Sequence, residues 1–253
     1  MELTKTKAYK SKLAFATYIV CTTLTVVTII LSIIFGVINN KIPDMVDRIL
    51  TCVLAIAVFN IPLFVGRKLK WDVPAFLQII VLLFALSHFV FGEIVGVYGM
   101  SLLFDKVLHT ISGVIAGIFG FSLVYALNAR KEGPRTFSPF FVALFAFCFA
   151  LAVGYVWELF EFSLDSLFGT NCQRWMDDFK EVIIDGEKVM VQNWGQGHGL
   201  IDTMMDMVVN SIGALSICIV GFIFLKKGKN GVNSWLVTTP KTRESSNASQ
   251  DSL

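Results

Sequence analysis

Acidic residues, histidines and an asparagine recur at helical spacing in three stretches of the second half of the sequence, DKVLHTISG, WELFEFSLD and HGLIDTMMDMVVN. The residues concerned are Asp105 and His109, then Glu158, Glu161 and Asp165, and finally His198, Asp202, Asp206 and Asn210. Neighbours within each stretch are three or four positions apart, which places their side chains on one face of a helix. Each stretch therefore predicts a helix with a single polar stripe.

The candidate chemistry of these stripes is cation binding or proton transfer. Carboxylates buried in a membrane need protons, cations or a metal ion nearby. The basic candidates are Lys106, His109, Arg174 and His198, which are too few for this number of acids. Either some of the carboxyl groups are protonated or a cation binds. A purely structural hydrogen-bonded cluster is the alternative.

A divalent metal ion is the candidate cofactor, because histidine and carboxylates together suit zinc, manganese, iron or magnesium. The candidate metal ligands are Asp105, His109, Glu158, Glu161 and Asp206. The candidate catalytic residues are these five and Asp202, and the further candidates for cofactor binding are Asn210 and His198. Neither an HExxH nor a CxxC spacing is present. A bound metal could activate water or polarise a phosphoryl oxygen, whereas the pair Asp105 and His109 alone is equally compatible with a proton relay or a simple hydrogen bond.

The helix dipole explains only part of this pattern. Acidic residues in the first turn of a helix complement the positive end of its dipole, which accounts for Asp105 and Asp202. Glu158 is predicted near a helix C-terminus, where a negative charge is unfavourable. Asp206 lies one turn deeper into its helix than Asp202. Glu158 and Asp206 therefore favour a functional polar site.

The elements that must carry these residues are transmembrane helices. The 253-residue chain is 55% hydrophobic and only 16% charged, whereas soluble domains carry about 25% charged residues. Long uncharged runs alternate with short charged clusters, and each run can cross a hydrocarbon core of ~30 Å as a helix. The predicted spans are 13–38, 48–66, 73–96, 104–127, 138–166 and 199–225. The predicted fold is therefore all-α, with a polytopic bundle of six transmembrane helices forming one membrane domain over 13–225.

Lysine and arginine residues predict the orientation of this bundle. They gather in the N-terminal tail 1–12, in the loops after the second and fourth spans, and in the tail 226–253. These four segments alternate to one side, which predicts both termini in the cytoplasm. The long loop 167–198 carries more acidic than basic residues and is predicted to be external. The polar ends of spans four, five and six then all lie toward the external face.

Other features refine the bundle and bear on its partners, among which the lipid bilayer is predicted and protein partners stay open. Pro62, after Asn60, is expected to kink the second span, and small residues such as Gly113 and Gly213 predict close packing of spans four and six. The C-terminal tail is polar and predicts disorder. A net charge of +2 gives no case for nucleic acid. The glycine-rich segment 193–199 lacks the Lys-Ser/Thr ending of a phosphate loop, so no nucleotide site is predicted.

The three polar stretches, taken in order, resemble the YjdF-like bacterial inner-membrane proteins, a family without an assigned function. The resemblance is carried by DKVLHTISG, WELFEFSLDSLFGTNCQRW and GLIDTMMDMVVNSIGA, within residues 73–225. More distantly, the chain is similar to the VanZ-like membrane proteins, which share an Asp-Lys-x-x-His start and a later Asp-rich helix with Asn and Gly. The resemblance implies a small multi-helix bacterial membrane protein and supplies no reaction. Its motif positions match Asp105, His109, Glu158, Glu161, Asp202, Asp206 and Asn210.

Three functions are compatible with this pattern. The first is an outward-facing acidic and histidine site, dependent on a divalent cation, that acts on a lipid or cell-envelope substrate. The second is a proton- or cation-coupled transporter, which ranks lower because the acids are predicted to lie shallow in the membrane and no internal repeat is visible. The third is a non-catalytic membrane scaffold. The residues leave open whether the protein is an enzyme.

Overall fold

The computed structural model describes residues 11–68, 71–128, 137–192, 197–226 and 236–237. Six helical segments in this part of the chain are long and apolar enough to cross a membrane. They are α1 (Lys12–Ile38), α2 (Ile42–Phe59) with α3 (Ile61–Lys68), α4 (Ala75–Leu86) with the π-helix η1 (Ser87–Ile94), α6 (Leu102–Asn128), α7 (Pro139–Phe168) and α8 (His198–Lys226). The predicted bundle of six transmembrane helices is confirmed.

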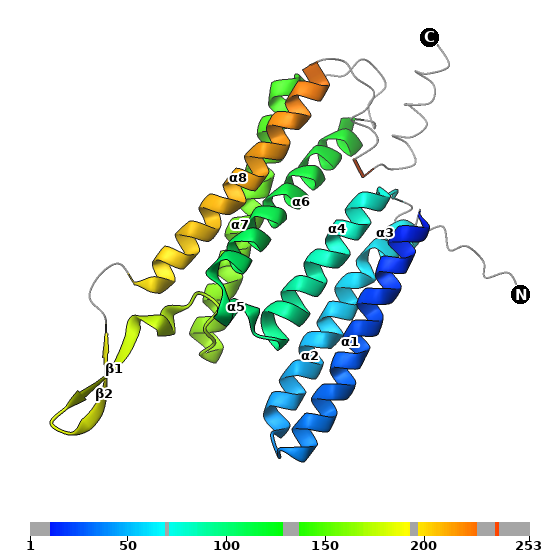
Figure 1. The fold of residues 1–253 in the computed structure, drawn as a ribbon. Coiled ribbons are helices and arrows are strands. Elements are labelled where there is room, and N and C mark those ends of the chain that lie inside the picture. The colour runs from blue at the N-terminus through cyan, green and yellow to red at the C-terminus, as the bar shows by residue number, and fades with distance from the viewer. Residues whose placement is uncertain (1–10, 69–70, 129–136, 193–196, 227–235, 238–253) are drawn as a thin grey trace, which may run out of the picture.

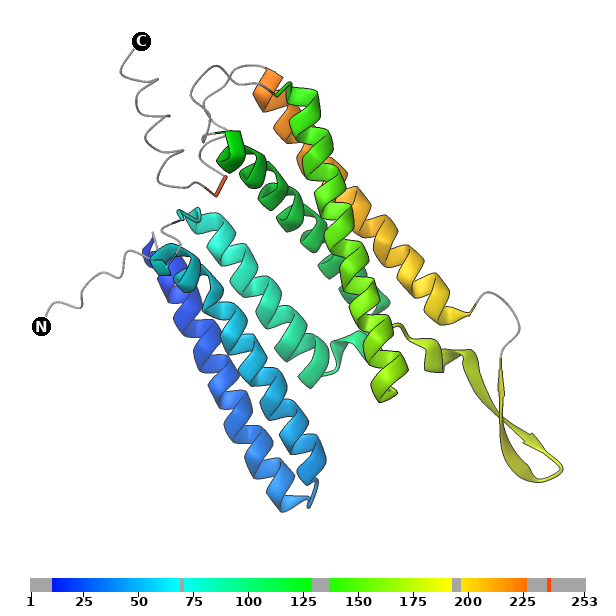
Figure 2. The ribbon, with the colours of Figure 1, turned by 180° about the vertical axis from the view of Figure 1, so that it is seen from behind.

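The helices form two groups that lie side by side (Figures 1 and 2). The first half consists of α1, α2, α3, α4 and η1, and the second half consists of α6, α7 and α8, with the most extensive packing between α6 and α8. The short helix α5 (Val97–Met100) joins the two halves. Near α5, helix α7 ends, α8 begins and a β-hairpin projects beyond the helices, so we call this the hairpin end of the bundle (Figure 1).

The second span is broken where the sequence predicts a kink. Helix α2 ends at Phe59 and α3 begins at Ile61, so Asn60 lies at the break. The Asn60 side chain donates to the carbonyl of Ile56 at 2.7 Å, and the Asn60 amide donates to the same oxygen at 3.2 Å, so this residue closes the end of α2. Pro62 occupies the first turn of α3, where the missing amide hydrogen costs no hydrogen bond.

Apolar side chains are divided between the interior of the bundle and its outer surface. In the first half, Phe59 and Leu82 are fully buried and belong to one core cluster. Many others point outward, including Leu13 and Ile38 at the two ends of α1, which are 67% and 73% exposed. A bilayer would cover this outward apolar surface. The exposure pattern therefore agrees with a membrane-embedded bundle.

Glycines bring α6 and α8 into close backbone contact. A Cβ atom on Gly113 would meet the backbone of Asn210, and one on Gly213 would meet the backbone of Thr110. A larger residue at either position would push the two helices apart. The predicted packing through small residues is confirmed, and it brings the polar stripes of α6 and α8 within reach of each other.

The long loop before α8 contains a β-hairpin that the sequence analysis missed. Strands β1 (Phe179–Ile184) and β2 (Glu187–Gln192) pair antiparallel around the residues Asp185 and Gly186. These two residues have φ angles of 52° and 85°. An Asp-Gly pair adopts such positive angles readily, which makes it a frequent two-residue hairpin turn. The Asp-Gly pair between two β-prone runs was the sequence clue to this hairpin.

A short part of the C-terminal tail is packed against the helices, in contrast to the disorder that its composition predicts. Leu236 and Val237 are buried, and the amide of Val237 donates to the hydroxyl of Ser122 at 2.9 Å. Val237 also packs with Leu77 of α4 and Ile118 of α6, so it bridges the two halves away from the hairpin end. The described residues do not include 1–10, 193–196 of the glycine-rich segment, 227–235 or 238–253.

Candidate functional site

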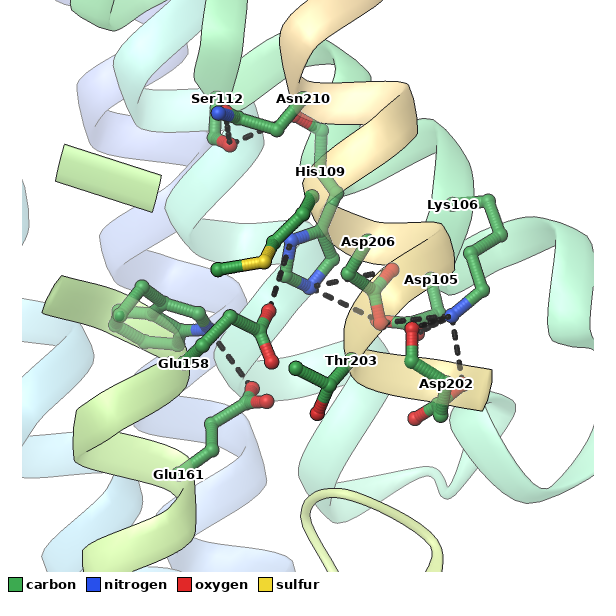
Figure 3. A network of polar contacts seen from close by, with 12 residues as sticks. Asp105, Lys106, His109, Ser112, Glu158, Glu161, Asp202, Thr203, Asp206 and Asn210 are labelled. Atoms are coloured by element: carbon green, nitrogen blue, oxygen red, sulfur yellow. Dashed lines mark hydrogen bonds and ion pairs between the residues drawn. The ribbon is translucent and has the colours of Figure 1, made fainter. Parts of the chain in front are cut away.

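The polar stripes of three helices meet at the hairpin end of the second half (Figure 3). The residues that meet are Asp105, Lys106 and His109 of α6, Glu158 of α7, and Asp202 and Asp206 of α8. The most exposed of these side chains are 17% accessible, and that of Asp206 is only 2% accessible. We call these six residues the polar cluster. Five of them were candidate site residues in the sequence.

Lys106 belongs to the polar cluster but was not one of the candidate site residues predicted from the sequence. Its Nζ atom lies 2.6 Å from Asp202 Oδ1, 2.7 Å from Asp206 Oδ2 and 3.1 Å from Asp105 Oδ2. These distances are those of direct hydrogen bonds. In the sequence Lys106 appeared only as one nearby base among four. Its position depends on the close approach of α6 to α8, which spacing along one helix does not reveal.

His109 lies between the carboxylates of all three helices. Its Nε2 atom is 3.5 Å from Asp105 Oδ1 and 3.7 Å from Asp206 Oδ1, while its Nδ1 atom is 3.8 Å from Glu158 Oε1. These separations exceed the range of about 2.7–3.2 Å that is usual for N–H···O hydrogen bonds. Two ligand atoms on one tetrahedral zinc ion, with bonds of about 2.0–2.1 Å, lie roughly 3.3 Å apart. The spacing around Nε2 is therefore closer to that of metal ligands than to that of hydrogen-bonded partners.

Two buried carboxylate oxygens of the polar cluster have no hydrogen-bond partner among the described residues, and one of them, Asp206 Oδ1, faces His109. Among the described residues, neither Asp206 Oδ1 nor Glu158 Oε2 has a partner, although both atoms are buried. A buried carboxylate oxygen without a partner costs free energy. One ligand atom each from Asp105, His109 and Asp206 lies within 4.8 Å of the other two. These three side chains can therefore hold a small cation, and the unpartnered Asp206 oxygen would be one of its ligands.

The charges within the polar cluster do not balance. Four carboxylates, from Asp105, Glu158, Asp202 and Asp206, surround one ammonium group and one imidazole. With all four carboxylates ionised and His109 protonated, two negative charges would remain uncompensated. Protons on the carboxyl groups or a divalent cation would remove this excess. A cation held here would polarise a bound oxygen or lower the pKa of a bound water.

Asn210 connects three helices one turn further along α8 than Asp206, above the polar cluster in Figure 3. Its Oδ1 accepts a hydrogen bond from the Ser112 hydroxyl of α6 at 3.2 Å, and its Nδ2 donates to the Ala150 carbonyl of α7 at 3.4 Å. The Asn210 side chain also lies against Gly154, where a Cβ atom would collide with it. Asn210 was a candidate for cofactor binding. Its contacts in the structure are those of a buried clamp between helices.

Residues 20–227 match the family described as predicted membrane protein, DUF2238. The chain belongs to this family. The match covers most of the sequence and agrees with the six apolar helices. No curated protein and no solved structure matches the chain.

Two candidate residues of this DUF2238 protein lie away from the centre of the polar cluster. Glu161 is one turn beyond Glu158 on α7, and its Oε1 accepts a hydrogen bond from Trp157 Nε1 of the same helix at 2.8 Å (Figure 3). His198 is the first residue of α8 and is exposed. Among the described residues of this DUF2238 protein, the group that could hold a metal ion consists of Asp105, His109 and Asp206 and includes neither of them.

Asp165 folds the segment after α7 across the start of α8. Its carboxylate accepts hydrogen bonds from the Thr170 hydroxyl at 2.6 Å and from the amides of Cys172 and Gln173 at 2.8 and 2.9 Å. The Gln173 side chain then donates to the Thr203 hydroxyl of α8 at 2.7 Å. Thr203 lies beside Glu158 and the polar cluster in Figure 3. This segment therefore covers part of the hairpin end next to the cluster.

On the side of the first half, α5 and η1 border the same region. Tyr98 of α5 forms a hydrogen bond with His88 Nδ1 of η1 at 2.5 Å, and the His88 ring packs edge-on against Trp157 of α7. Burial raises the pKa of the Tyr98 phenol, so this hydroxyl stays protonated at neutral pH. Gly92 gives the Tyr98 ring its space, because a Cβ there would collide with the ring. The π-helical geometry of η1 occurs next to the cluster, as π-helices often do beside functional sites.

Proposed function

We propose that this chain is a bacterial plasma-membrane protein whose polar cluster binds a divalent cation and acts on a lipid or cell-envelope substrate. The observation that carries the proposal is the arrangement of Asp105 Oδ1, His109 Nε2 and Asp206 Oδ1. The two oxygens lie 3.5 and 3.7 Å from Nε2, and the Asp206 oxygen is buried without a hydrogen-bond partner among the described residues. One ligand atom from each of the three residues lies within 4.8 Å of the other two. Two carboxylates and one imidazole suit zinc, manganese or iron.

Glu158 supports the same proposal from behind His109. Metal-bound histidines usually direct their second ring nitrogen at a carboxylate or carbonyl, which fixes the ring orientation. Glu158 Oε1 lies 3.8 Å from His109 Nδ1, on the opposite side of the ring from Asp105 and Asp206. We therefore propose Asp105, His109 and Asp206 as metal ligands, Glu158 as the residue that orients His109, and Asp202 as a partner of Lys106.

The surroundings of the polar cluster favour an amphiphilic substrate. Asp105 and Lys106 each keep 17% of their side-chain surface accessible. On the same turn of α6, Leu102 and Leu103 are 59% and 71% exposed and form part of the surface that lipid would cover. A lipid headgroup or an envelope precursor could therefore bring a polar group to the cluster while its chain stays in the bilayer.

The orientation of the site is part of the proposal. Lysine and arginine residues favour the side of the membrane opposite the hairpin end. We propose that both termini lie in the cytoplasm and that the polar cluster opens to the external face. The resemblance to YjdF-like and VanZ-like proteins is compatible with this arrangement.

A transporter accounts less well for the position of the cluster. Substrate sites of secondary transporters usually lie near the middle of the bilayer, between structural repeats. Asp105 is instead in the first turn of α6, and Asp202 lies one turn after the start of α8 at His198. A scaffold function does not explain why Asp206 Oδ1 is buried without a hydrogen-bond partner among the described residues.

The proposal is tested by cation titration of the purified full-length protein in lipid nanodiscs. We expect Zn²⁺ or Mn²⁺ to bind and to raise the melting temperature. Asp206→Asn and His109→Gln should each weaken this binding by more than about a hundredfold, because each removes one of three ligands. Asp44→Asn is the matched control, because Asp44 is exposed and its ion pair with Lys41 is a loose contact of 3.9 Å.

The proposed action on a lipid or cell-envelope substrate is tested with the same variants in cells. Both ligand variants should insert normally and reproduce the envelope phenotype of a strain that lacks the gene. Wild-type envelope composition in both variants would argue for the scaffold. Proteoliposome ion flux that depends on Asp206 would argue for the transporter.

A further inference from the structure

The Lys106 side chain makes direct hydrogen bonds to three aspartates of the polar cluster, yet a cation-binding site does not by itself require a lysine. Its Nζ binds Oδ2 of both Asp105 and Asp206, at 3.1 and 2.7 Å. The opposite oxygen of each aspartate, Oδ1, is the atom that faces His109 Nε2. Lys106 therefore occupies one oxygen of each proposed aspartate ligand and leaves the other oxygen available to a cation.

This division of oxygens limits how a cation can bind. Calcium takes six to eight oxygen ligands and often uses both oxygens of a carboxylate. Zinc is satisfied by about four ligands, with one atom from each side chain. A cation held by Asp105, His109 and Asp206 has one oxygen from each aspartate, because Lys106 holds the second. This geometry suits a small transition-metal ion, whereas it offers too few oxygen ligands for calcium.

We propose that Lys106 is the specificity-determining residue of this site and that it favours zinc-like ions over calcium by keeping Asp105 and Asp206 monodentate. The inference deepens the proposed function and rests on the same cation site. Its second support is independent of charge. The Asp206 side chain is 2% exposed, and its Oδ1 has no hydrogen-bond partner among the described residues, which aims that one oxygen at a ligand.

Asp202 explains why Lys106 stays in place. Asp202 Oδ1 is 2.6 Å from Lys106 Nζ, the shortest of the three ion pairs. The Asp202 backbone oxygen also accepts from Nζ at 3.5 Å. The carboxylates closest to the His109 ring nitrogens, at 3.5–3.8 Å, belong to Asp105, Asp206 and Glu158. Asp202 therefore anchors the lysine without being one of the proposed metal ligands.

The ammonium group has a second effect, which acts on every cation alike. Its positive charge repels any ion held by the same carboxylates, and this repulsion lowers the affinity for zinc and calcium together. Outer-shell partners usually strengthen metal binding by about 10–100-fold, so removal of Lys106 has two opposing effects on absolute affinity. The ratio of the two affinities is free of the common repulsion and isolates the proposed selectivity.

The test measures Zn²⁺ and Ca²⁺ affinities of the full-length protein in nanodiscs for wild type and Lys106→Met. We expect the preference for Zn²⁺ over Ca²⁺ to fall by at least about tenfold in Lys106→Met, because calcium gains a second oxygen from each aspartate. Lys41→Met is the matched control. Lys41 is a largely exposed lysine at the same end of the bundle, and its removal should leave the ratio unchanged.

A second variant protects the test against misfolding of Lys106→Met. The double variant Lys106→Met with Asp202→Asn removes one positive and one negative charge and keeps Asp105, His109 and Asp206. We expect it to fold and to show the same fall in selectivity. Tight Zn²⁺ binding with an unchanged or larger Zn²⁺ preference would overturn the role of Lys106 and leave the proposed site intact. Failure of wild type and every variant to bind either ion would overturn both.

Discussion

The two halves of the molecule use their interiors differently. The first half is held by apolar contacts such as those of Phe59 and Leu82, and its buried Thr25 hydroxyl bonds to the carbonyl of Cys21 on its own helix at 2.9 Å. In the second half, buried charged groups reach across helices, as from Lys106 to Asp206 at 2.7 Å. Apolar packing needs complementary shape, whereas the cross-helix ion pairs need particular atoms at particular distances. The comparison assigns stability mainly to the first half and chemistry to the second.

The comparison predicts its largest effect on stability in the first half. Leu82→Ala should lower the free energy of unfolding by roughly 2–5 kcal/mol, because Leu82 is fully buried and its truncation leaves a cavity. The cation affinity of the protein should change by less than about threefold, because Leu82 belongs to the core of the other half. Melting curves and cation titrations of the same sample give both quantities.

The neighbouring residue provides the control for this experiment. Leu83 is 48% exposed on the outer surface of α4, so Leu83→Ala should change stability far less than Leu82→Ala. A loss of cation affinity in Leu82→Ala comparable to that of a ligand variant would mean that the halves are not separate in function. The division drawn here would then have to be abandoned.

In the second half we expect a substitution to weaken cation binding while it leaves stability nearly unchanged. Glu158→Gln should weaken cation binding by about 10–100-fold, because the carboxylate behind His109 Nδ1 no longer orients the ring as a charged acceptor. The shape of the side chain is preserved, so the melting temperature of the cation-free protein should stay near that of wild type. Titration and melting in chelator separate the two effects.

Glu181→Gln is the matched control for Glu158→Gln. Glu181 is a glutamate on the hairpin whose ion pair with Lys188 is exposed, at 2.6 Å, and exposed pairs contribute little. Equal affinities for Glu158→Gln and Glu181→Gln would remove Glu158 from the site. A large fall in the melting temperature of Glu158→Gln would make it a structural residue, more like those of the first half.

The sequence predicted the first half and the helices of the second half more completely than it predicted the polar cluster. Apolar run lengths and Pro62 were enough to locate the spans and the break, because both act locally along the chain. The positions of Asp105 and Asp206 on polar faces also followed from helical spacing. The role of Lys106 did not, because it depends on how α6 is rotated against α8. That rotation is set by the close contacts of Gly113 and Gly213 with the backbone of the facing helix. Spacing along one helix does not reveal contacts between two helices.

The two halves also differ in how open they are at the hairpin end. This difference predicts the smallest effect, a change in the reactivity of a thiol. At the hairpin end of the first half, an open hollow of about 430 Å³ lies beside Asp44 and Glu93. In the second half, the segment held by Asp165 covers the start of α8. Cys172 belongs to this covering segment, and burial raises the pKa of its thiol to about 11. The thiol should therefore carry roughly a hundredfold less reactive thiolate at neutral pH than an unperturbed cysteine.

Labelling of Cys172 with a membrane-impermeant maleimide tests the covered state in a variant that retains no other cysteine. Because the thiol pKa is raised, the labelling rate should be low near neutral pH and should increase as the pH rises towards 11. Asp44→Cys in a cysteine-free background should react quickly at neutral pH, since Asp44 is exposed. Asp165→Ala should accelerate Cys172 labelling, because it removes the acceptor of the Cys172 amide. If Cys172 reacts as fast as the cysteine at position 44, the segment does not cover the second half, and the polar cluster is as open to the outside as the hollow of the first.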